Sequence, residues 1–202
     1  MGSTPGAFGE AEIATQWLLL TPLRPEDAEP MAGVLADKRL HEFIGGSPAS
    51  AADLRARYRR LAVGSPDPGE AWLNWIVRLS ATGEPVGTVQ ATVVRRGERW
   101  EAVVAWVIGT AWQGRGYASE AARALVDWLS GQGATVITAH IHPRHTASAR
   151  VAERAGLVPT AGEVDGERVW RLARGEDRLR SQHDASEQRS AANGAGAQRP
   201  DA

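Results

Sequence analysis

The chain contains no cysteine. A disulfide framework, a thiolate nucleophile and a cysteine-ligated metal are therefore excluded. No apolar run approaches the roughly 18 residues that a membrane-spanning helix needs. The first residues also lack the basic and then apolar segments of a secretory signal. These absences favour a soluble, cytoplasmic protein that does not bind membranes.

The chain also has no excess of charge of either sign. It carries 23 Lys and Arg residues against 24 Asp and Glu residues, for a net charge of -1. This balance argues against a protein held to nucleic acid by bulk positive charge, so no nucleic-acid partner is expected. Hydrophobic residues make up 43% of 202 residues, which is enough to bury the core of one domain of ordinary size.

The two ends of the chain differ in composition from its middle. Residues 1–14 are small and polar, and we expect them to form a flexible N-terminus. Residues 176–202 contain no aromatic or β-branched side chain, and Leu179 is their only large apolar residue. Such a segment cannot bury enough surface to offset its chain entropy, which predicts a disordered tail. A single domain is expected over residues 15–175.

Hydrophobic periodicity and turn residues predict an α/β fold, with a mixed sheet between helices on both faces. Strands are predicted at 17–23, 72–79, 86–94, 100–108, 136–142 and 167–172, with a further strand near 159–164. Helices are predicted at 24–36, 50–62, 118–129 and 146–155. The strand at 100–108 is apolar on both faces apart from Glu101, which predicts that helices cover both of its sides.

The most informative stretch is the glycine-rich turn between the strand ending at Ile108 and the helix starting near Ala118. Free N–H groups and the positive end of the helix dipole converge there, which is typical of an anion site. Gly114 and Gly116 would allow close approach of a ligand, although a plain tight turn is the alternative. A P-loop is excluded because the stretch has no lysine. A dinucleotide fingerprint fails because only two glycines fit and the preceding strands form hairpins.

The sequence Gln113-Gly114-Arg115-Gly116-Tyr117-Ala118 matches every defined position of the pattern Gln/Arg-x-x-Gly-x-Gly/Ala. The GNAT family of N-acetyltransferases uses this pattern for the pyrophosphate of coenzyme A. Residues 142–148 and 151–157 resemble the second signature of that family. Residues 20–28 and 82–87 resemble the first strand and helix and the central hairpin of its ribosomal-protein N-terminal acetyltransferase branch. The resemblance covers about residues 15–173.

The resemblance implies the GNAT fold, a mostly antiparallel sheet that is splayed at the cofactor site and has helices on both faces. It implies that acetyl-CoA lies between strands 100–108 and 136–142, that an amine attacks the thioester directly, and that no metal is needed. Main-chain groups of Trp106, Val107 and Ile108 would hold the pantetheine arm. The pyrophosphate would lie on the main chain of Gln113, Gly114, Arg115, Gly116, Tyr117, Ala118 and Ser119. His145 replaces a family asparagine beside the cofactor and can still cap the helix that follows.

Two side chains are candidates for proton transfer. Glu101 is the only acid in its strand and lies at the spacing of a glutamate base in the histone-acetyltransferase branch. The alternative is a strand-end glutamate that reaches solvent. Many family members carry a tyrosine that protonates the leaving thiolate, but Ala152 stands at that position. Ser148 is then the candidate acid, and ordinary helix capping is its alternative role.

His140, His142 and His145 are close enough in sequence to suggest a metal site. Only two of them share a strand face, and no carboxylate follows at ligand spacing, so no metal is expected. A place for His140 or His142 beside the acceptor pocket, or in partial contact with solvent, agrees better with the pattern.

The resulting hypothesis is an N-acetyltransferase, monomeric or homodimeric, that acts on a primary amine of a small molecule or a protein N-terminus. The missing tyrosine leaves a second hypothesis open, an acyl-CoA-binding regulatory module that has lost its chemistry.

Overall fold

The computed structural model describes residue 8 and residues 11–172. The predicted tail, residues 176–202, lies outside this range. The chain divides into a compact unit, Met1–Arg171, and a second unit, Leu172–Ala202, of which only Leu172 is described. Among the described residues, no helix has the length and apolar composition to cross a membrane.

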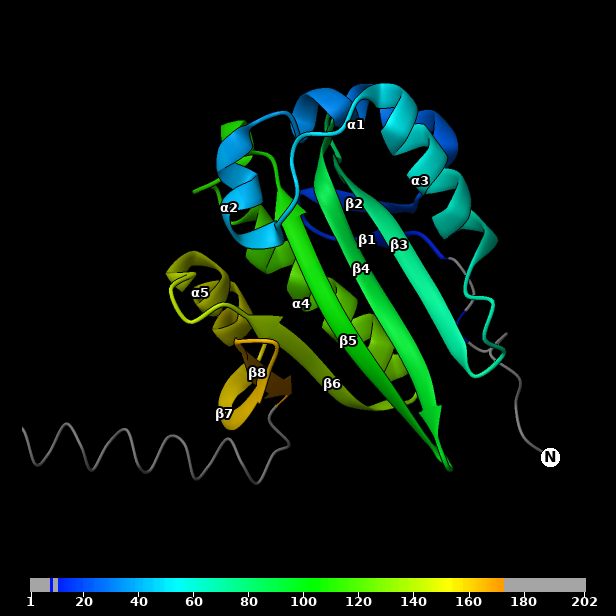
Figure 1. The fold of residues 1–202 in the computed structure, drawn as a ribbon, viewed down its shortest axis with the longest axis vertical. Helices are drawn as coiled ribbons and strands as arrows, with labels where there is room; N and C mark the ends of the chain where they lie inside the picture. The colour runs from blue at the N-terminus through cyan, green and yellow to red at the C-terminus, as the bar shows by residue number, and fades with distance from the viewer. Residues whose placement is uncertain (1–7, 9–10, 173–202) are drawn as a thin grey trace, which may run out of the picture. The chain divides into compact units, whose positions relative to one another are not determined.

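The described strands form one mixed sheet of eight strands in the order β1-β2-β3-β4-β5-β6-β8-β7 (Figure 1). Their bounds are β1 Ile13–Ala14, β2 Leu18–Pro22, β3 Glu70–Leu79, β4 Pro85–Arg96, β5 Arg99–Ile108, β6 Ala134–Ile141, β7 Leu157–Val164 and β8 Glu167–Leu172. The mixed sheet confirms the predicted fold class, and β7 confirms the further strand. Neighbouring strands with a defined register run antiparallel, except for β5 and β6, which are parallel.

The helices agree with the prediction in place but differ at their ends. The first predicted helix is divided into a 3-10 turn, η2, and the helix α1. The segment η3 and α2 follows it and was not predicted. The bounds are η2 Pro25–Asp27, α1 Ala28–Val34, η3 Lys38–Leu40, α2 His41–Ile44, α3 Ala51–Val63, η4 Thr110–Trp112, α4 Tyr117–Gly131 and α5 Thr146–Arg154.

The main core lies between the sheet and α4, which contacts β5, β6, β2 and β4. Its stripe of Ala121, Leu125 and Leu129 is fully buried, as the period of 3.6 residues predicts. The facing strands contribute Leu18, Leu20, Trp75, Val77, Val89, Val93, Ala102 and Val104. Trp75 also meets Trp128 of α4 edge to face, with ring centroids 5.3 Å apart.

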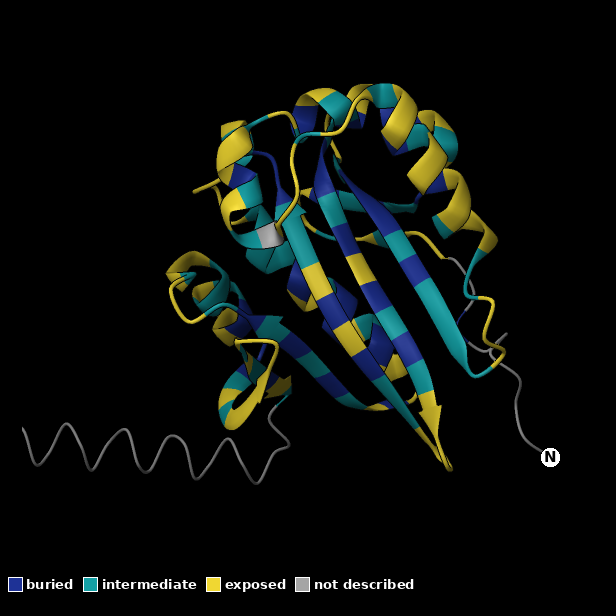
Figure 2. Ribbon diagram, in the orientation of Figure 1, coloured by how far each residue is buried: buried dark blue, intermediate teal, exposed yellow. Residues whose placement is uncertain are grey.

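The opposite face of the sheet is covered only in part. Here α1 and α3 contact β4 and β3 and enclose a second apolar cluster. Its members are Leu23, Ala28, Met31, Val34, Leu54, Tyr58 and Ile76. The rest of this face stays open, and exposed and buried residues alternate along β4 and β5 (Figure 2).

The open face corrects the expectation that the strand at 100–108 is buried on both sides. Ala102 and Val104 point into the α4 core, whereas Val103 and Ala105 are exposed. No helix layer lies over the outer face of this part of β5 among the described residues. Apolar residues there line a cavity instead of a second core.

The segment expected to be flexible, residues 1–14, makes tertiary contacts wherever it is described. Phe8 is 4% exposed and meets Trp100 edge to face at 5.3 Å between ring centroids. The carbonyl of Ala11 accepts a 2.8 Å hydrogen bond from the indole of Trp75. Ile13 and Ala14 then pair with β2. A single buried aromatic side chain therefore anchors a segment whose composition is otherwise small and polar.

Candidate functional site

The parallel strands β5 and β6 pair only over their first halves. Their register runs from Trp100 opposite Ala134 to Val103 opposite Thr138 and ends there. Beyond this point the two strands diverge, with α5 at the end of β6 and α2 near the end of β5 (Figure 1). The splay expected between these strands is therefore present. It leaves main-chain groups of β5 from Val104 onward without a neighbouring strand on that side.

The glycine-rich loop joins the splayed end of β5 to α4. Gly114 and Gly116 have φ angles of 76° and 87°, a left-handed conformation that side chains disfavour. The Nε2 group of Gln113 donates a 2.9 Å hydrogen bond to the carbonyl of Ile108 and ties the loop to the strand. The N–H groups in the first turn of any helix lack intrahelical acceptors, and at the start of α4 no side chain of the described residues caps them.

A cavity of about 550 Å³, the loop cavity, lies against this turn. The residues expected at the cofactor that line it are Trp106, Val107, Ile108, Gln113, Gly114, Gly116, Tyr117, Ala118, Ser119 and His145. Arg115 belongs to the same loop but does not line the cavity. Ser148 lines it as well.

The loop cavity is also lined by residues that the sequence did not single out. Three of them are arginines: Arg39 from η3, and Arg150 and Arg154 from α5. Arg150 and Arg154 are four residues apart on a helix, and this spacing places them on one face. Their shared face could therefore have been predicted from the sequence. Arg39 gave no such signal, because η3 and α2 are too short for periodicity. Arg39 also binds Asp37 at 2.6 Å, and hydrogen bonds from Arg39 hold the pKa of Asp37 well below its usual range.

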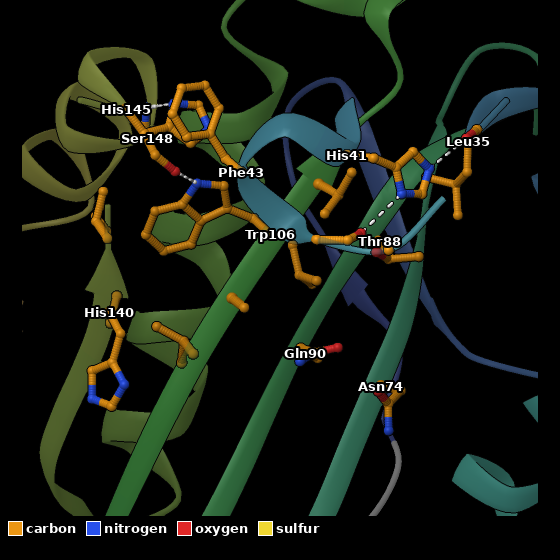
Figure 3. A pocket seen from close by; sticks show the side chains of 18 of the residues that line it. Leu35, His41, Phe43, Asn74, Thr88, Gln90, Trp106, His140, His145 and Ser148 are labelled. Atoms are coloured by element: carbon orange, nitrogen blue, oxygen red, sulfur yellow. Dashed lines mark hydrogen bonds between the residues drawn. The ribbon is translucent and has the colours of Figure 1, made fainter. Parts of the chain in front are cut away.

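A second cavity of about 450 Å³, the sheet-face cavity, lies over the open face of β3, β4 and β5. Asn74, Gln90 and Ala105 stand side by side in its floor, because their strands are paired in that register. His140 lies beyond them on β6, across the splay (Figure 3). The walls include Leu54, Arg57, Tyr58 and Leu61 from α3, and Glu167 at the start of β8.

The two cavities meet at five shared lining residues: Phe43, Trp106, Val107, His145 and Ser148. The indole of Trp106 donates a 3.0 Å hydrogen bond to Oγ of Ser148 and so connects β5 to α5 across the splay (Figure 3). Phe43 of α2 stacks on His145 with ring centroids 4.1 Å apart. The two cavities therefore adjoin at these residues, and the Trp106–Ser148 hydrogen bond lies at the boundary between them.

His145 caps α5, as expected, since its Nδ1 accepts the N–H of Ser148 at 3.4 Å. This bond requires an unprotonated Nδ1. Burial lowers the pKa of His145, the neighbouring His142 lowers it further, and Glu42 opposes both effects. The ring is thus held in the neutral form that the cap needs.

The structure does not bring Glu101 to the splay. Glu101 lies where β5 is still paired with Val136 of β6, and it lines neither cavity. Trp106 is five steps further along the strand, which amounts to about 17 Å. Glu167 is instead the carboxylate that lines the sheet-face cavity. It lies one step beyond the pairing of Arg168 with Ile141, and therefore next to His142.

Two of the three neighbouring histidines share one aromatic neighbour. Phe43 stacks on His145 at 4.1 Å between ring centroids and lies 5.6 Å from the ring of His142, whose Nδ1 accepts the N–H of Arg144 at 3.2 Å. His140 lines the sheet-face cavity. Among the described residues, no three His, Asp or Glu side chains are arranged to hold a metal ion.

Comparisons with known proteins agree with this geometry. The model of a family described as an acetyltransferase (GNAT) domain matches residues 18–158. No curated protein matches the chain. An acetyltransferase from Agrobacterium tumefaciens is 27% identical, with coverage of 83% of this chain and 96% of its own and a TM-score of 0.63.

Two further solved structures share the fold at lower identity. RimL, a ribosomal L7/L12 alpha-N-protein acetyltransferase in complex with coenzyme A, is 16% identical; the match covers 81% of this chain and 97% of RimL, with a TM-score of 0.64. The aminoglycoside acetyltransferase AAC(6')-Ib, in complex with paromomycin and acetyl-CoA, is 22% identical. That match covers 82% of this chain and 97% of the other, with a TM-score of 0.63.

Proposed function

This chain belongs to the GNAT acetyltransferase family and is an acetyl-CoA-dependent acyltransferase, and from that premise we propose that it acetylates a primary amine by direct attack on the thioester. The observation that supports this most is the junction of the two cavities at the splay. One cavity suits a phosphate-bearing cosubstrate, and we assign the other, which lies over the open face of β3, β4 and β5, to the acceptor. Their shared residues mark where the two reactants would meet.

The loop cavity fits coenzyme A. Gly114 and Gly116 line it, and a Cβ atom added at either would meet no atom within 4 Å, so no side chain of the described residues fills the space beside them. The N–H groups at the start of α4 and the arginines Arg150 and Arg154 supply donors and positive charge, whereas the charge of Arg39 is paired with Asp37. We propose that the main chain of residues 113–119 holds the pyrophosphate and that residues 106–108 hold the pantetheine arm. When bound, acetyl-CoA supplies the thioester.

The acceptor amine must lose a proton before it attacks, because a free alkyl amine has a pKa near 10. We propose Glu167 as the general base, in place of Glu101. Among the described residues, Glu167 is the one carboxylate that lines the sheet-face cavity, and it makes no ion pair there. His142 is less suited, because the N–H of Arg144 already occupies its Nδ1.

Ser148 remains the proposed acid for the leaving thiolate. Its Oγ accepts the indole N–H of Trp106, so its own proton is free to point into the junction. Trp106 acts as a positioning residue in this arrangement, since it fixes the serine without contacting the reacting atoms. A thiolate leaves readily, so the acid should matter less than the base.

The test is thiol release from acetyl-CoA in the presence of an amine library, followed by mass measurement of the product. With any confirmed amine, Glu167→Gln should lower turnover by about 10²–10⁴-fold, the usual contribution of a general base. Glu101→Gln is the matched control and should stay near the wild-type rate. Equal losses in both variants would refute the assignment of the base. Tight acetyl-CoA binding without thiol release for any amine would instead favour the regulatory module.

A further inference from the structure

The sheet-face cavity has opposite charges on opposite walls. Glu167 stands on the wall formed by β8, and Arg57 stands on the wall formed by α3. Neither side chain forms an ion pair with any described residue. In the sheet order, β3, which α3 covers, is separated from β8 by β4, β5 and β6. The two charges therefore face the same space from its two ends.

Other groups near Arg57 strengthen the positive end. The neighbouring Tyr58 is 3% exposed, lines the cavity, and has a hydroxyl group with no hydrogen-bond partner among the described residues. Burial raises the pKa of Tyr58 to about 12, so this hydroxyl carries its proton at neutral pH and can donate it in a hydrogen bond. In the floor, the amide groups of Asn74 and Gln90 make no side-chain hydrogen bond within the described range. Hydrogen-bond donors thus gather at the end of the cavity away from Glu167.

From this arrangement we propose that the acceptor is a zwitterion: its amine lies on the Glu167 side of the cavity, and an anionic group such as a carboxylate meets Arg57, next to the buried hydroxyl group of Tyr58. This inference rests on the proposed N-acetyltransferase function and specifies the substrate class of that site. Adjacent strands are about 4.8 Å apart, so β3 and β8, four spacings apart in the sheet order, lie about 19 Å apart. Because the long side chains of Glu167 and Arg57 both line the cavity and take up roughly half of this span, the nitrogen and the anion should be separated by no more than about 10 Å. A polycation such as an aminoglycoside or a polyamine would meet one carboxylate and be repelled by Arg57.

Three amines of one chain length test the proposal: 6-aminohexanoate, hexylamine and hexane-1,6-diamine. Their extended length is close to that of two amino-acid residues, about 7 Å. The zwitterion should have the highest kcat/KM and the diamine the lowest. Arg57→Gln should lower kcat/KM for 6-aminohexanoate about tenfold, mainly through KM, and leave hexylamine unchanged. Arg59→Gln is the matched control, since Arg59 is exposed on the same helix but does not line the cavity.

Tyr58→Phe provides a second readout. If the hydroxyl binds the anion, KM for 6-aminohexanoate rises while the melting temperature does not fall. A preference for the diamine, or an Arg57→Gln effect that is equal for all three amines, would overturn the zwitterion. So would a library in which polycations are acetylated and 6-aminohexanoate is not, although the proposed N-acetyltransferase function would stand. Absence of thiol release with every amine would refute that function itself.

Discussion

Replacing Gly87 with alanine tests whether the splayed end of β5 is held by close packing against β4. Gly87 lies in β4 opposite Val77 on one side and Ile108 on the other. A Cβ atom at this position would lie 2.2 Å from the carbonyl oxygen of Val107 and 2.7 Å from Cδ1 of Ile108. The isoleucine side chain can rotate away, but the carbonyl belongs to the backbone. The residue is a glycine because the two strands approach closely here.

The size of the effect follows from that contact. To reach 3.0 Å, below which Cβ contacts essentially never occur, β5 must retreat by roughly 0.8 Å. Overpacking a well-filled site costs up to about 3 kcal/mol, and a rigid backbone neighbour favours the upper end. For a domain of this size, that loss lowers the melting temperature by about 6–12 °C. Val107 lines both cavities, so its displacement should also lower turnover by about 10²-fold.

The assay is thermal unfolding together with calorimetric titration of acetyl-CoA. Gly33→Ala is the matched control, because Gly33 is exposed in α1 and a Cβ atom there meets nothing within 4 Å. Alanine in a helix should stabilise this control by up to about 1 kcal/mol. If Gly87→Ala has the same melting temperature as the control and the same acetyl-CoA affinity as the wild type, close packing at Val107 does not hold the splay.

Three further predictions concern the loop and the junction. Gly116→Asp should abolish acetyl-CoA binding in calorimetry, because it puts a carboxylate at the anion site. Gly116→Asn is the control: asparagine also tolerates the left-handed conformation and should retain part of the affinity. Unchanged affinity in the aspartate variant would contradict the loop assignment. Ser148→Ala should lower turnover less than Glu167→Gln does and leave acetyl-CoA affinity near wild type in the same titrations. The pKa of His145 is lowered from 6.5 in the folded state, so its contribution to stability is present above that value and is lost as the pH falls below it. Melting temperatures between pH 7 and pH 5 should therefore fall more steeply for the wild type than for His145→Asn, and parallel curves would show that the cap does not titrate.

The parts of the fold that sequence patterns predicted are those set by local rules. Alternation identified β3, the glycines marked the loop, and the apolar stripe located α4. The segment from Lys38 to Ile44 gave no pattern, because each of its elements has fewer than five residues. It nevertheless places Phe43 at the junction of both cavities. The burial of Phe8 was not predicted for a similar reason. A single aromatic residue in a polar segment gives no pattern, and the sequence does not indicate that Phe8 contacts Trp100.

The position of Glu101 away from the splay has a different origin. Glu101 and Trp106 lie on the same strand, β5. The sequence does not indicate at which residue of β5 the pairing with the neighbouring strand ends. That point is set by the pairing of β5 with β6, which ends at Val103, beyond Glu101. The carboxylate that does line the sheet-face cavity, Glu167, follows the splay by more than 20 residues in the chain and arrives through the pairing of β8 with β6. Nothing near Glu167 in the sequence indicates that it faces a cavity.

The same contrast separates recognition of the cosubstrate from recognition of the acceptor. The proposed pyrophosphate site is one continuous stretch, residues 113–119, so a short pattern is enough to reveal it. The sheet-face cavity is assembled from α2, α3, β3, β4, β5, β6, α5 and β8, and its charged residues Arg57 and Glu167 are far apart in the chain. If the sheet-face cavity binds the acceptor, as proposed, substitutions in α3 should change acceptor choice without disturbing the loop. This independence explains why the Gln113–Ala118 pattern identifies the cosubstrate but carries no information about the amine, and why Arg57 and Tyr58 are the positions at which acceptor choice should be tested first.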